Sequence, residues 1–296
     1  MHYKDHFLFT KADRLAATLP PLVVQAQKYA DILWHGVHSR RRSGSGHSFW
    51  QYRPYSTGDM PRHIDWRKSA RGDHVLVRQE EWETSHPVCL WSDHNPGMGY
   101  HSHPDLPTKA HSADIITLCL TSLLLRGGET VQLGDHKLHN KAHYTDLYHH
   151  TDFLQLSPPN PRRLPRNSTL IYCSDFLQKI SLTRQQLTPY TTKADRLLLI
   201  QILDPAEDTF PFKGRTHFYD LQDADDVLIG DAESVREAYL KRFHKHQARL
   251  KDLVHSWARH SDCRLLTYRT DQPLLPFLLS LYQILHAAEH TGRRHR

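Results

Sequence analysis

The sequence lacks the features that define several protein classes. Its 13 glycines and 17 prolines among 296 residues form no short repeat, which excludes a collagen-like chain. Hydrophobic residues make up 39% of the chain and aromatic residues 10%, so wholesale disorder is also excluded. The cysteines are few, far apart and without a CxxC pair, and each lies in an apolar run. We interpret them as reduced core residues: Cys89, Cys119, Cys173 and Cys263.

Long apolar runs are missing as well. The two longest, residues 115–125 and 274–285, are interrupted and fall short of the roughly 20 residues that a membrane-spanning helix needs. The N-terminus has no basic region followed by an apolar one, so nothing indicates a secretory signal. We therefore expect a globular protein with no membrane span and a cytoplasmic location.

Positive charge is concentrated in one segment. The chain has 38 Lys and Arg against 32 Asp and Glu, a formal net charge of +6. Residues 35–72 hold eight of these cations against only Asp59 and Asp65. The net positive charge of this segment therefore equals that of the whole chain. The 25 histidines add charge only below about pH 6.5.

Two kinds of pattern divide the chain. Residues 11–34 have helical apolar spacing that Pro20 and Pro21 interrupt, which predicts two helical pieces. A polar Gly/Ser loop at residues 39–46 follows, and then aromatic residues alternate with tight-turn signals up to the strand-like residues 75–78. We call residues 35–84 the basic insert and expect short β-strands in it.

From Pro87 onward, short apolar strands alternate with amphipathic helices. The expected strands are residues 88–92, 130–133, 169–174, 196–203 and 264–268, and the expected helices are 109–126, 182–190, 232–259 and 274–289. This alternation predicts an α/β fold with a doubly wound, mainly parallel sheet and helices on both faces. The Gly134-Asp135 turn predicts a short antiparallel edge at residues 137–139, and residues 143–166 are expected to be helix plus loop.

Carboxylates follow four of the expected strands: Asp93, Asp175, Asp204 and Asp271. Ligands of open parallel sheets bind beyond the carboxyl ends of the strands, so these acids could gather around a hard cation such as magnesium. The alternative is that each Asp forms a helix cap or a turn.

One long stretch carries a family resemblance. Ser43-Gly-Ser-Gly-His-Ser-Phe-Trp-Gln-Tyr-Arg53-Pro-Tyr55, followed by Gly58-Asp59-Met-Pro-Arg62-His-Ile-Asp65-Trp66-Arg-Lys-Ser69-Ala70-Arg71, resembles the signature of the family called domain of unknown function fifty-eight. The likeness continues through Asp93 to Met98, Lys109, the turn at residues 127–129, Asp204 to Glu207 with residues 210–214, and residues 268–273.

The resemblance implies a von Willebrand factor A-like domain over residues 85–289. An N-terminal helical segment and the basic β-rich insert would precede it at residues 1–84, and a basic tail would follow at residues 290–296. It also implies a non-catalytic protein-interaction adaptor that acts with a MoxR-type AAA+ ATPase in protein maturation or complex assembly.

The same resemblance implies a degenerate metal-ion-dependent adhesion site. The expected pattern DxSxS reads here as Asp93, Asn95 and Gly97, so two hydroxyl ligands are missing. Asp175 matches the later aspartate, and Thr151 is the candidate for the threonine. Asp93, Asn95 and Asp175 are thus the candidate partner-binding or metal residues, although no cofactor is expected and magnesium is only an alternative.

The basic insert admits two interpretations. Arginines could stack with aromatic residues and bind phosphates, as in a single-stranded nucleic-acid-binding module. The favoured alternative is an Arg–Asp network that locks turns around a buried Trp66, which makes nucleic acid an unfavoured partner. The signature residues concerned are Arg53, Tyr55, Gly58, Asp59, Arg62, Asp65, Trp66, Ser69 and Arg71.

Catalytic motifs are absent from the sequence. It contains no phosphate-binding GxxxxGK[ST], no HExxH and no GxSxG. We therefore predict no catalytic residue and no enzyme activity.

Overall fold

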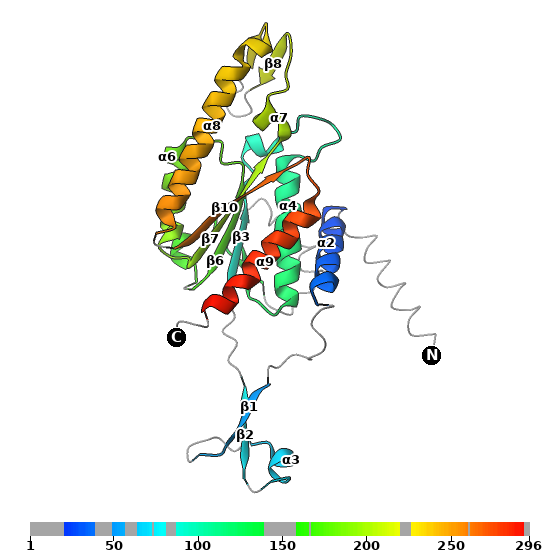
Figure 1. Cartoon of the computed structure of the whole chain (residues 1–296), viewed down its shortest axis with the longest axis vertical. Helices are drawn as coiled ribbons and strands as arrows, with labels where there is room; N and C mark the ends of the chain where they lie inside the picture. Colours follow the sequence, from blue (N-terminus) through cyan, green and yellow to red (C-terminus); the bar gives the residue numbers. More distant parts are fainter. Residues whose placement is uncertain are drawn as a thin grey trace, which may run out of the picture. The chain divides into compact units, whose positions relative to one another are not determined.

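A six-stranded sheet forms the centre of the larger of two units (Figure 1). The computed structural model describes residues 21–38, 49–56, 64–72, 74–80, 87–138, 158–165, 167–219, 226–259 and 261–292. The sheet order is β10-β7-β6-β3-β4-β5. All neighbours are parallel except β5, which pairs antiparallel with β4 at the edge. The strands are β3 (Val88–Ser92), β4 (Val131–Leu133), β5 (His136–Leu138), β6 (Thr169–Ser174), β7 (Arg196–Leu203) and β10 (Asp262–Arg269).

Helices cover both faces of this sheet, which explains why its strands are apolar on both sides. On one face α6 (Ile180–Thr191) and α8 (Ala232–Trp257) enclose a core that includes Leu187, Leu250 and Trp257. On the other face lie α4 (Lys109–Arg126) and α9 (Leu274–Gly292) (Figure 1). Fourteen residues of α4 are buried, so this helix is enclosed on nearly all sides.

Helix α2 (Pro21–His38) belongs to the larger unit as far as Trp34. Its buried residues Ala26, Ala30 and Leu33 share one face, and Asp31 forms an ion pair of 2.6 Å with Arg126 of α4. The expected division placed residues 1–84 together before the domain. The structure instead groups α2 with the sheet and separates a smaller unit within His35–Ser85. The physical reason is that α2 has an apolar face, which only the larger core can cover.

The smaller unit contains a two-stranded antiparallel sheet of β1 (Phe49–Pro54) and β2 (Leu76–Glu80), with the short helix α3 (Trp66–Ser69). Asp65 caps α3, since its Oδ1 accepts a hydrogen bond of 3.0 Å from the Lys68 amide. The hydroxyl of Ser69 donates to the Asp65 carbonyl at 2.7 Å and accepts from the Leu76 amide at 2.8 Å. The strand-like pattern of the basic insert is therefore confirmed.

A second two-stranded sheet lies between β7 and α8. The short helix α7 (Pro205–Thr209) leads into β8 (Thr216–Tyr219), which pairs antiparallel with β9 (Asp226–Ile229). Two 3₁₀ turns complete the described chain, η2 (Pro96–Gly99) and η4 (Pro161–Arg163).

Most of the expected elements of the larger unit are confirmed. The doubly wound α/β architecture is present, and β5 forms the predicted antiparallel edge one residue earlier than expected. Helix α9 extends beyond residue 289 to Gly292, so part of the expected tail is helical. The sequence missed β8 and β9, whose four-residue strands are too short for a clear periodicity. The first of the two expected helical pieces, and most of the expected helix within residues 143–166, fall outside the described residues.

No helix in the described part of the chain is both long enough and apolar enough to cross a membrane.

Candidate functional site

The candidate site lies at the carboxyl edge of the central strands. Asp93 follows β3, Asp175 follows β6 and Asp204 follows β7, and these three strands are neighbours in the sheet. The chain runs from β3 to β4 on one side, and β6 lies on the other side of β3. Strand order reverses between β3 and β6, which is where open α/β sheets form ligand crevices.

Asp93 is held by neutral hydrogen-bond donors. Its Oδ2 accepts from the Tyr172 hydroxyl at 3.0 Å, the Ser174 hydroxyl at 2.8 Å and Nδ2 of Asn95 at 2.9 Å. Its Oδ1 accepts from the Asn95 amide at 3.1 Å. Both carboxylate oxygens are therefore already hydrogen-bonded within the protein.

Aromatic packing positions one of these donors. The Tyr172 ring stacks on Trp91 of β3, with a centroid distance of 4.1 Å and an interplanar angle of 9°. Burial raises the pKa of Tyr172 well above its usual value, so its hydroxyl keeps the proton that it donates to Asp93. Gln186 of α6 donates to the same hydroxyl at 3.5 Å.

Asp175 is held by a cation. The ammonium of Lys109, the first residue of α4, lies 2.9 Å from Asp175 Oδ2 and 2.5 Å from Glu207 Oε1. The Lys109 side chain is 1% exposed, and those of Asp175 and Glu207 are 7% and 12% exposed. Lys109 thus connects the loop after β6 to helix α7.

The pKa values of this group follow from burial and charge. Burial by itself lowers the pKa of Lys109, but the attraction of Glu207 and Asp175 outweighs it, so the pKa is raised and the ammonium stays charged. Burial raises the pKa of Glu207, and Lys109 opposes that rise. The buried Asp175 and the partly buried Glu207 thus share one ammonium.

The backbone is strained directly after Asp175. Phe176, which follows it, has a φ of +52°, a conformation that bulky residues rarely adopt. Hydrogen bonds hold this turn, because the Asp175 carbonyl accepts from Gln201 at 3.0 Å and the Phe176 carbonyl lies 2.7 Å from His246 Nε2. Strain of this kind persists where the surrounding structure enforces it, often at functional sites.

Gly97 lies between the Asn95 side chain, which is bonded to Asp93, and the Asp175 carboxylate. A Cβ at this position would lie 3.0 Å from Asn95 Oδ1 and 3.2 Å from Asp175 Oδ2. The loop after β3 therefore passes so close to Asp175 that only glycine fits without displacement. The candidate residues Asp93, Asn95 and Asp175 do come together, as the sequence predicted.

The other two aspartates behave as the simpler interpretation predicted. Asp204 caps α7, since its Oδ1 accepts from the Ala206 amide at 2.8 Å, and Glu207 completes the capping box. Asp271 pairs with Arg269 at 2.8 Å. Asp204 also contacts two segments of the site, because its amide donates to Glu207 Oε2 at 2.9 Å and its Oδ2 accepts from the Ser102 amide at 2.9 Å.

A second polar group lies beside Asp93. His94 Nε2 and the Ser92 hydroxyl both contact Asp114 Oδ1, at 3.0 and 3.2 Å. The hydrogen bond to Asp114 is the main reason why the pKa of His94 is raised above its usual value. Of Ser92, the His94 ring contacts the backbone carbonyl, at 3.2 Å from Nδ1, and not the hydroxyl, so the two residues do not form a nucleophile with its base.

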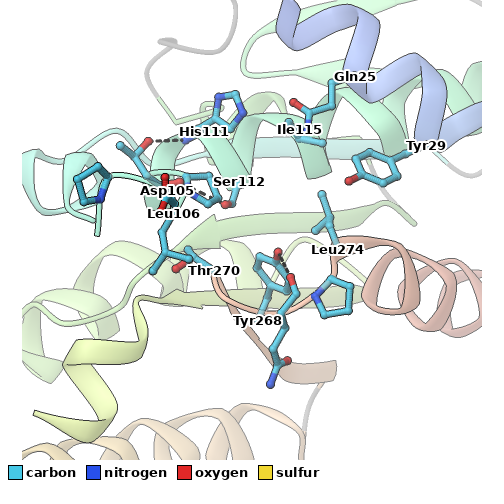
Figure 2. A pocket seen from close by; sticks show the side chains of 15 residues that line it. Gln25, Tyr29, Asp105, Leu106, His111, Ser112, Ile115, Tyr268, Thr270 and Leu274 are labelled. Atoms are coloured by element: carbon cyan, nitrogen blue, oxygen red, sulfur yellow. Dashed lines mark hydrogen bonds between the residues drawn. The ribbon is translucent and has the colours of Figure 1, made fainter. Parts of the chain in front are cut away.

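A cavity of about 630 Å³ opens between α2, the start of α4 and the start of α9 (Figure 2). Tyr29, His111, Ile115, Tyr268 and Leu274 contribute to its lining. No sequence pattern indicates this cavity, because its walls come from segments far apart in the chain.

The signature residues of the basic insert have separate roles where they are described. Asp65 and Ser69 hold α3 to β2. Trp66 is 64% exposed, so the expectation that turns enclose a buried Trp66 is wrong. No residue of α3 is buried, because so small a unit has too little core to cover an indole ring.

Tyr55 and Arg71 are exposed as well. Gly58, Asp59 and Arg62, the Arg53 side chain and the candidate Thr151 lie outside the described residues.

The sequence did not assign roles to Lys109 and Glu207. One signal was available for each. Lys109 directly follows the Thr108 cap and opens a helix of mostly apolar residues, where a lysine is unexpected beside the positive end of the helix. Asp204 and Glu207 have the spacing of a capping box.

Within the described ranges, no three His, Cys, Asp or Glu side chains form a group that could hold a metal ion. Burial raises the pKa of each of the four cysteine thiols to about 12, so they are unreactive core residues, as predicted: Cys89, Cys119, Cys173 and Cys263.

Fold and site together define an α/β protein with a doubly wound, mainly parallel sheet and a polar edge where its strand order reverses. The chain belongs to the family described as "Protein of unknown function DUF58", whose model matches residues 51–143 and 137–249. It is 28% identical over 292 residues to uncharacterized protein Mb1516 of Mycobacterium bovis and, equally, to uncharacterized protein Rv1480 of Mycobacterium tuberculosis. Each alignment covers 88% of this chain and 87% of the relative. No solved structure matches the chain.

Proposed function

We propose that the larger unit is a von Willebrand factor A-like domain that binds protein partners and catalyses no reaction. In this proposal it acts with a MoxR-type AAA+ ATPase in protein maturation or complex assembly. The fold assignment is supported by the sheet order and by the positions of Asp93 and Asp175 after neighbouring strands, where the adhesion-site pattern expects its aspartates. The free, buried thiols fit a reducing compartment, so we propose the cytoplasm as its location.

The observation that carries the proposal is a pair of large exposed side chains, Tyr219 and Leu228, on one face of the β8–β9 hairpin. In this antiparallel pair His217 lies opposite Leu228, and Tyr219 lies opposite Asp226. Tyr219 is 69% exposed and Leu228 52% exposed. We call His217, Tyr219 and Leu228 the hairpin face. Large apolar side chains gathered in this way mark protein-binding surfaces, and tyrosine is enriched at their centres.

The opposite face of the hairpin anchors it to the domain. Phe218 packs on Phe210 and Phe212, with ring centroids 5.8 and 5.1 Å away. Phe210 in turn packs on Tyr239 of α8 at 4.7 Å. The hairpin face is therefore presented on a support that is fixed to α7 and α8, and its binding requires little loss of conformational entropy.

The hydrogen bonding at the carboxyl edge supports a binding role over a catalytic one. A general base needs a carboxylate that can accept a substrate proton. Here Asp93 Oδ2 already accepts three hydrogen bonds, and Asp175 is paired with Lys109.

The test is recovery of a specific ATPase. A tagged full-length chain is used for pull-downs from native cells with and without ATP, the AAA+ protein is identified, and it is purified for a binding assay. We expect Tyr219→Ser/Leu228→Ser to weaken binding by at least about tenfold. Leu182→Ser, at another exposed leucine on α6, is the matched control and should bind as the wild type does. Failure to recover any AAA+ protein, or equal binding by the hairpin variant and the control, contradicts the proposal.

A second candidate function is single-stranded nucleic-acid binding by the smaller unit. Its support is the exposure of Trp66 at 64% and Tyr55 at 41%, within the segment that holds the positive excess. Exposed aromatic rings among cations are the usual stacking platforms for bases.

A salt titration with a labelled single-stranded oligonucleotide separates the two candidates. Nucleic-acid binding predicts that log affinity falls linearly with log salt, with a slope of about −0.7 for each phosphate contacted. Trp66→Ala should then weaken binding by about fivefold or more, while Val75→Ala, at another exposed residue of the same unit, should not. Binding that is absent, or insensitive to salt and to Trp66→Ala, removes this candidate.

A further inference from the structure

A buried ammonium pairs with Asp175, one of the residues at which the resemblance expects a metal ion. Lys109 is 1% exposed, and a lysine is almost never buried to that degree without a charged partner. Its Nζ contacts Asp175, the residue that matches the later aspartate of the adhesion site, and Glu207 from α7. The Tyr100 ring lies on a further side, 6.0 Å from Nζ to the ring centroid.

While Lys109 is in place, the oxygens at this edge do not fit a divalent cation. Such an ion takes about six oxygen ligands, of which one or two are usually protein carboxylates that bind it directly. Three donors already point at Asp93 Oδ2, and Gly97 contributes no side-chain oxygen. At Asp175 Oδ2 an ammonium is 2.9 Å away, and its charge would repel a second cation.

We propose that the side chain of Lys109 is the resident cation of this edge and takes the place of the divalent ion between the loop after β6 and helix α7. The protein thus carries, as part of its own chain, the positive charge that would otherwise be supplied by metal. This inference stands independently of which partner the hairpin face binds.

The position of Lys109 in α4 supports the proposal. The N-terminal end of a helix is positive, so a lysine at its first residue is disfavoured there by its own helix. The carboxylates of Asp175 and Glu207 overcome this cost, and their attraction outweighs burial to raise the pKa of Lys109. The Lys109 ammonium therefore stays charged although burial and the helix dipole both oppose it, and its role is to hold Asp175 and Glu207 together.

Binding at this edge should be insensitive to chelators if Lys109 replaces the metal ion. A metal site is sensitive to chelators and leaves coordination positions open for a partner's carboxylate. A tethered ammonium is always present and offers only its three donors, of which two are used here. Whatever binds at this edge should therefore do so without a divalent ion.

The test compares the full-length wild type with Lys109→Ala in EDTA, and then with millimolar Mg²⁺ or Mn²⁺. We expect the melting temperature of the wild type to be the same in all three conditions. Lys109→Ala should melt about 10 °C lower in EDTA, because it leaves two buried carboxylates without their cation. Mn²⁺ or Mg²⁺ should raise the melting temperature of this variant by about 3–6 °C, the shift expected when a ligand is present at about ten times its dissociation constant.

The matched control is Lys109→Ala/Glu207→Gln, which removes one of the two carboxylates and should lose most of the metal-induced shift. A wild-type melting temperature that rises with Mn²⁺ or Mg²⁺ and falls with EDTA would overturn the proposal. So would a Lys109→Ala variant that responds to no cation. The wild-type measurement requires no variant, and calorimetric titration of the wild type with Mn²⁺ decides the question if Lys109→Ala does not fold.

Discussion

Two aspartates at the same edge of the sheet are held in different ways. Asp93 accepts hydrogen bonds from three neutral side chains, whereas Asp175 pairs with the buried ammonium of Lys109. Neutral donors from β6 and the loop after β3 stabilise the Asp93 charge locally. The Lys109 ammonium also ties together three segments that are far apart in the sequence.

The difference shows two solutions to one problem. A carboxylate withdrawn from water must recover its lost hydration, either from several dipoles or from one opposite charge. Dipoles fix the orientation of a side chain, while a shared cation couples the elements that carry its partners. We therefore expect the Lys109 group to contribute more to the stability of the edge than the Asp93 group does.

The largest expected effect is that of Lys109→Met. This change keeps the volume of the side chain but leaves Asp175 and Glu207 as unpaired buried charges, which should lower the free energy of unfolding by about 3–5 kcal/mol in urea denaturation. Adding Asp175→Asn and Glu207→Gln to Lys109→Met should recover most of that loss. If Lys109→Met alone unfolds within about 1 kcal/mol of the wild type, the coupling attributed to the ammonium is absent.

Asp93→Ala should come second. It leaves the Tyr172 and Ser174 hydroxyls and the Asn95 amide without their acceptor, at an expected cost of about 2–4 kcal/mol in the free energy of unfolding. Asp271→Ala, at an exposed aspartate of the same sheet edge, is the control and should cost less than about 1 kcal/mol. Equal losses of unfolding free energy in the two variants, measured by the same denaturation, would show that the hydrogen bonds to Asp93 do not stabilise the fold more than an exposed ion pair does.

Gly97→Ala tests the contact between the two groups. Its Cβ would press on Asn95 Oδ1 at 3.0 Å and Asp175 Oδ2 at 3.2 Å, so both groups must shift, and we expect a loss of about 1–2 kcal/mol. Gly99→Ala in the same 3₁₀ turn meets no atom within 4 Å and should change stability by less than about 0.5 kcal/mol. Comparable thermal melts for the two variants would mean that the loop has room to relax.

The smallest effect concerns pH and His94. Because the bond to Asp114 raises the folded-state pKa of His94 above 6.5, its stabilisation is fully present below about pH 6.5 and is lost as the pH rises through the raised value. The difference in unfolding free energy between the wild type and His94→Gln should therefore be larger at about pH 5.5 than at about pH 8.5. Denaturation at both pH values checks the sign, and a difference that grows with pH contradicts it.

Much of the larger unit could be predicted because its signals are local. The boundaries of β3, β6, β7 and α4 agree with the sequence pattern to the residue. Asp93 and Asp175 could be placed together because parallel neighbouring strands end at one edge. The roles of Asp204 and Asp271 follow from the ordinary chemistry of caps and turns.

Other features depend on contacts that no local pattern encodes. The partners of Lys109 lie 66 and 98 residues away in the chain, and only the sheet order brings them within hydrogen-bond distance. The expected Arg–Asp network would lock turns around a buried Trp66, but the small unit around this residue offers too little core to cover it. The hairpin face was missed because two four-residue strands give too short a period to detect.

By itself, the sequence determined the order of strands and helices, the parallel sheet and the aspartates at its edge, since periodicity and turn chemistry act over a few neighbouring residues. The tertiary structure decided what those aspartates bind. It buried Lys109 between the loop after β6 and helix α7, and it left Tyr219 and Leu228 exposed on a hairpin. Burial and charge pairing depend on which distant segments become neighbours, and that is settled only when the sheet has assembled.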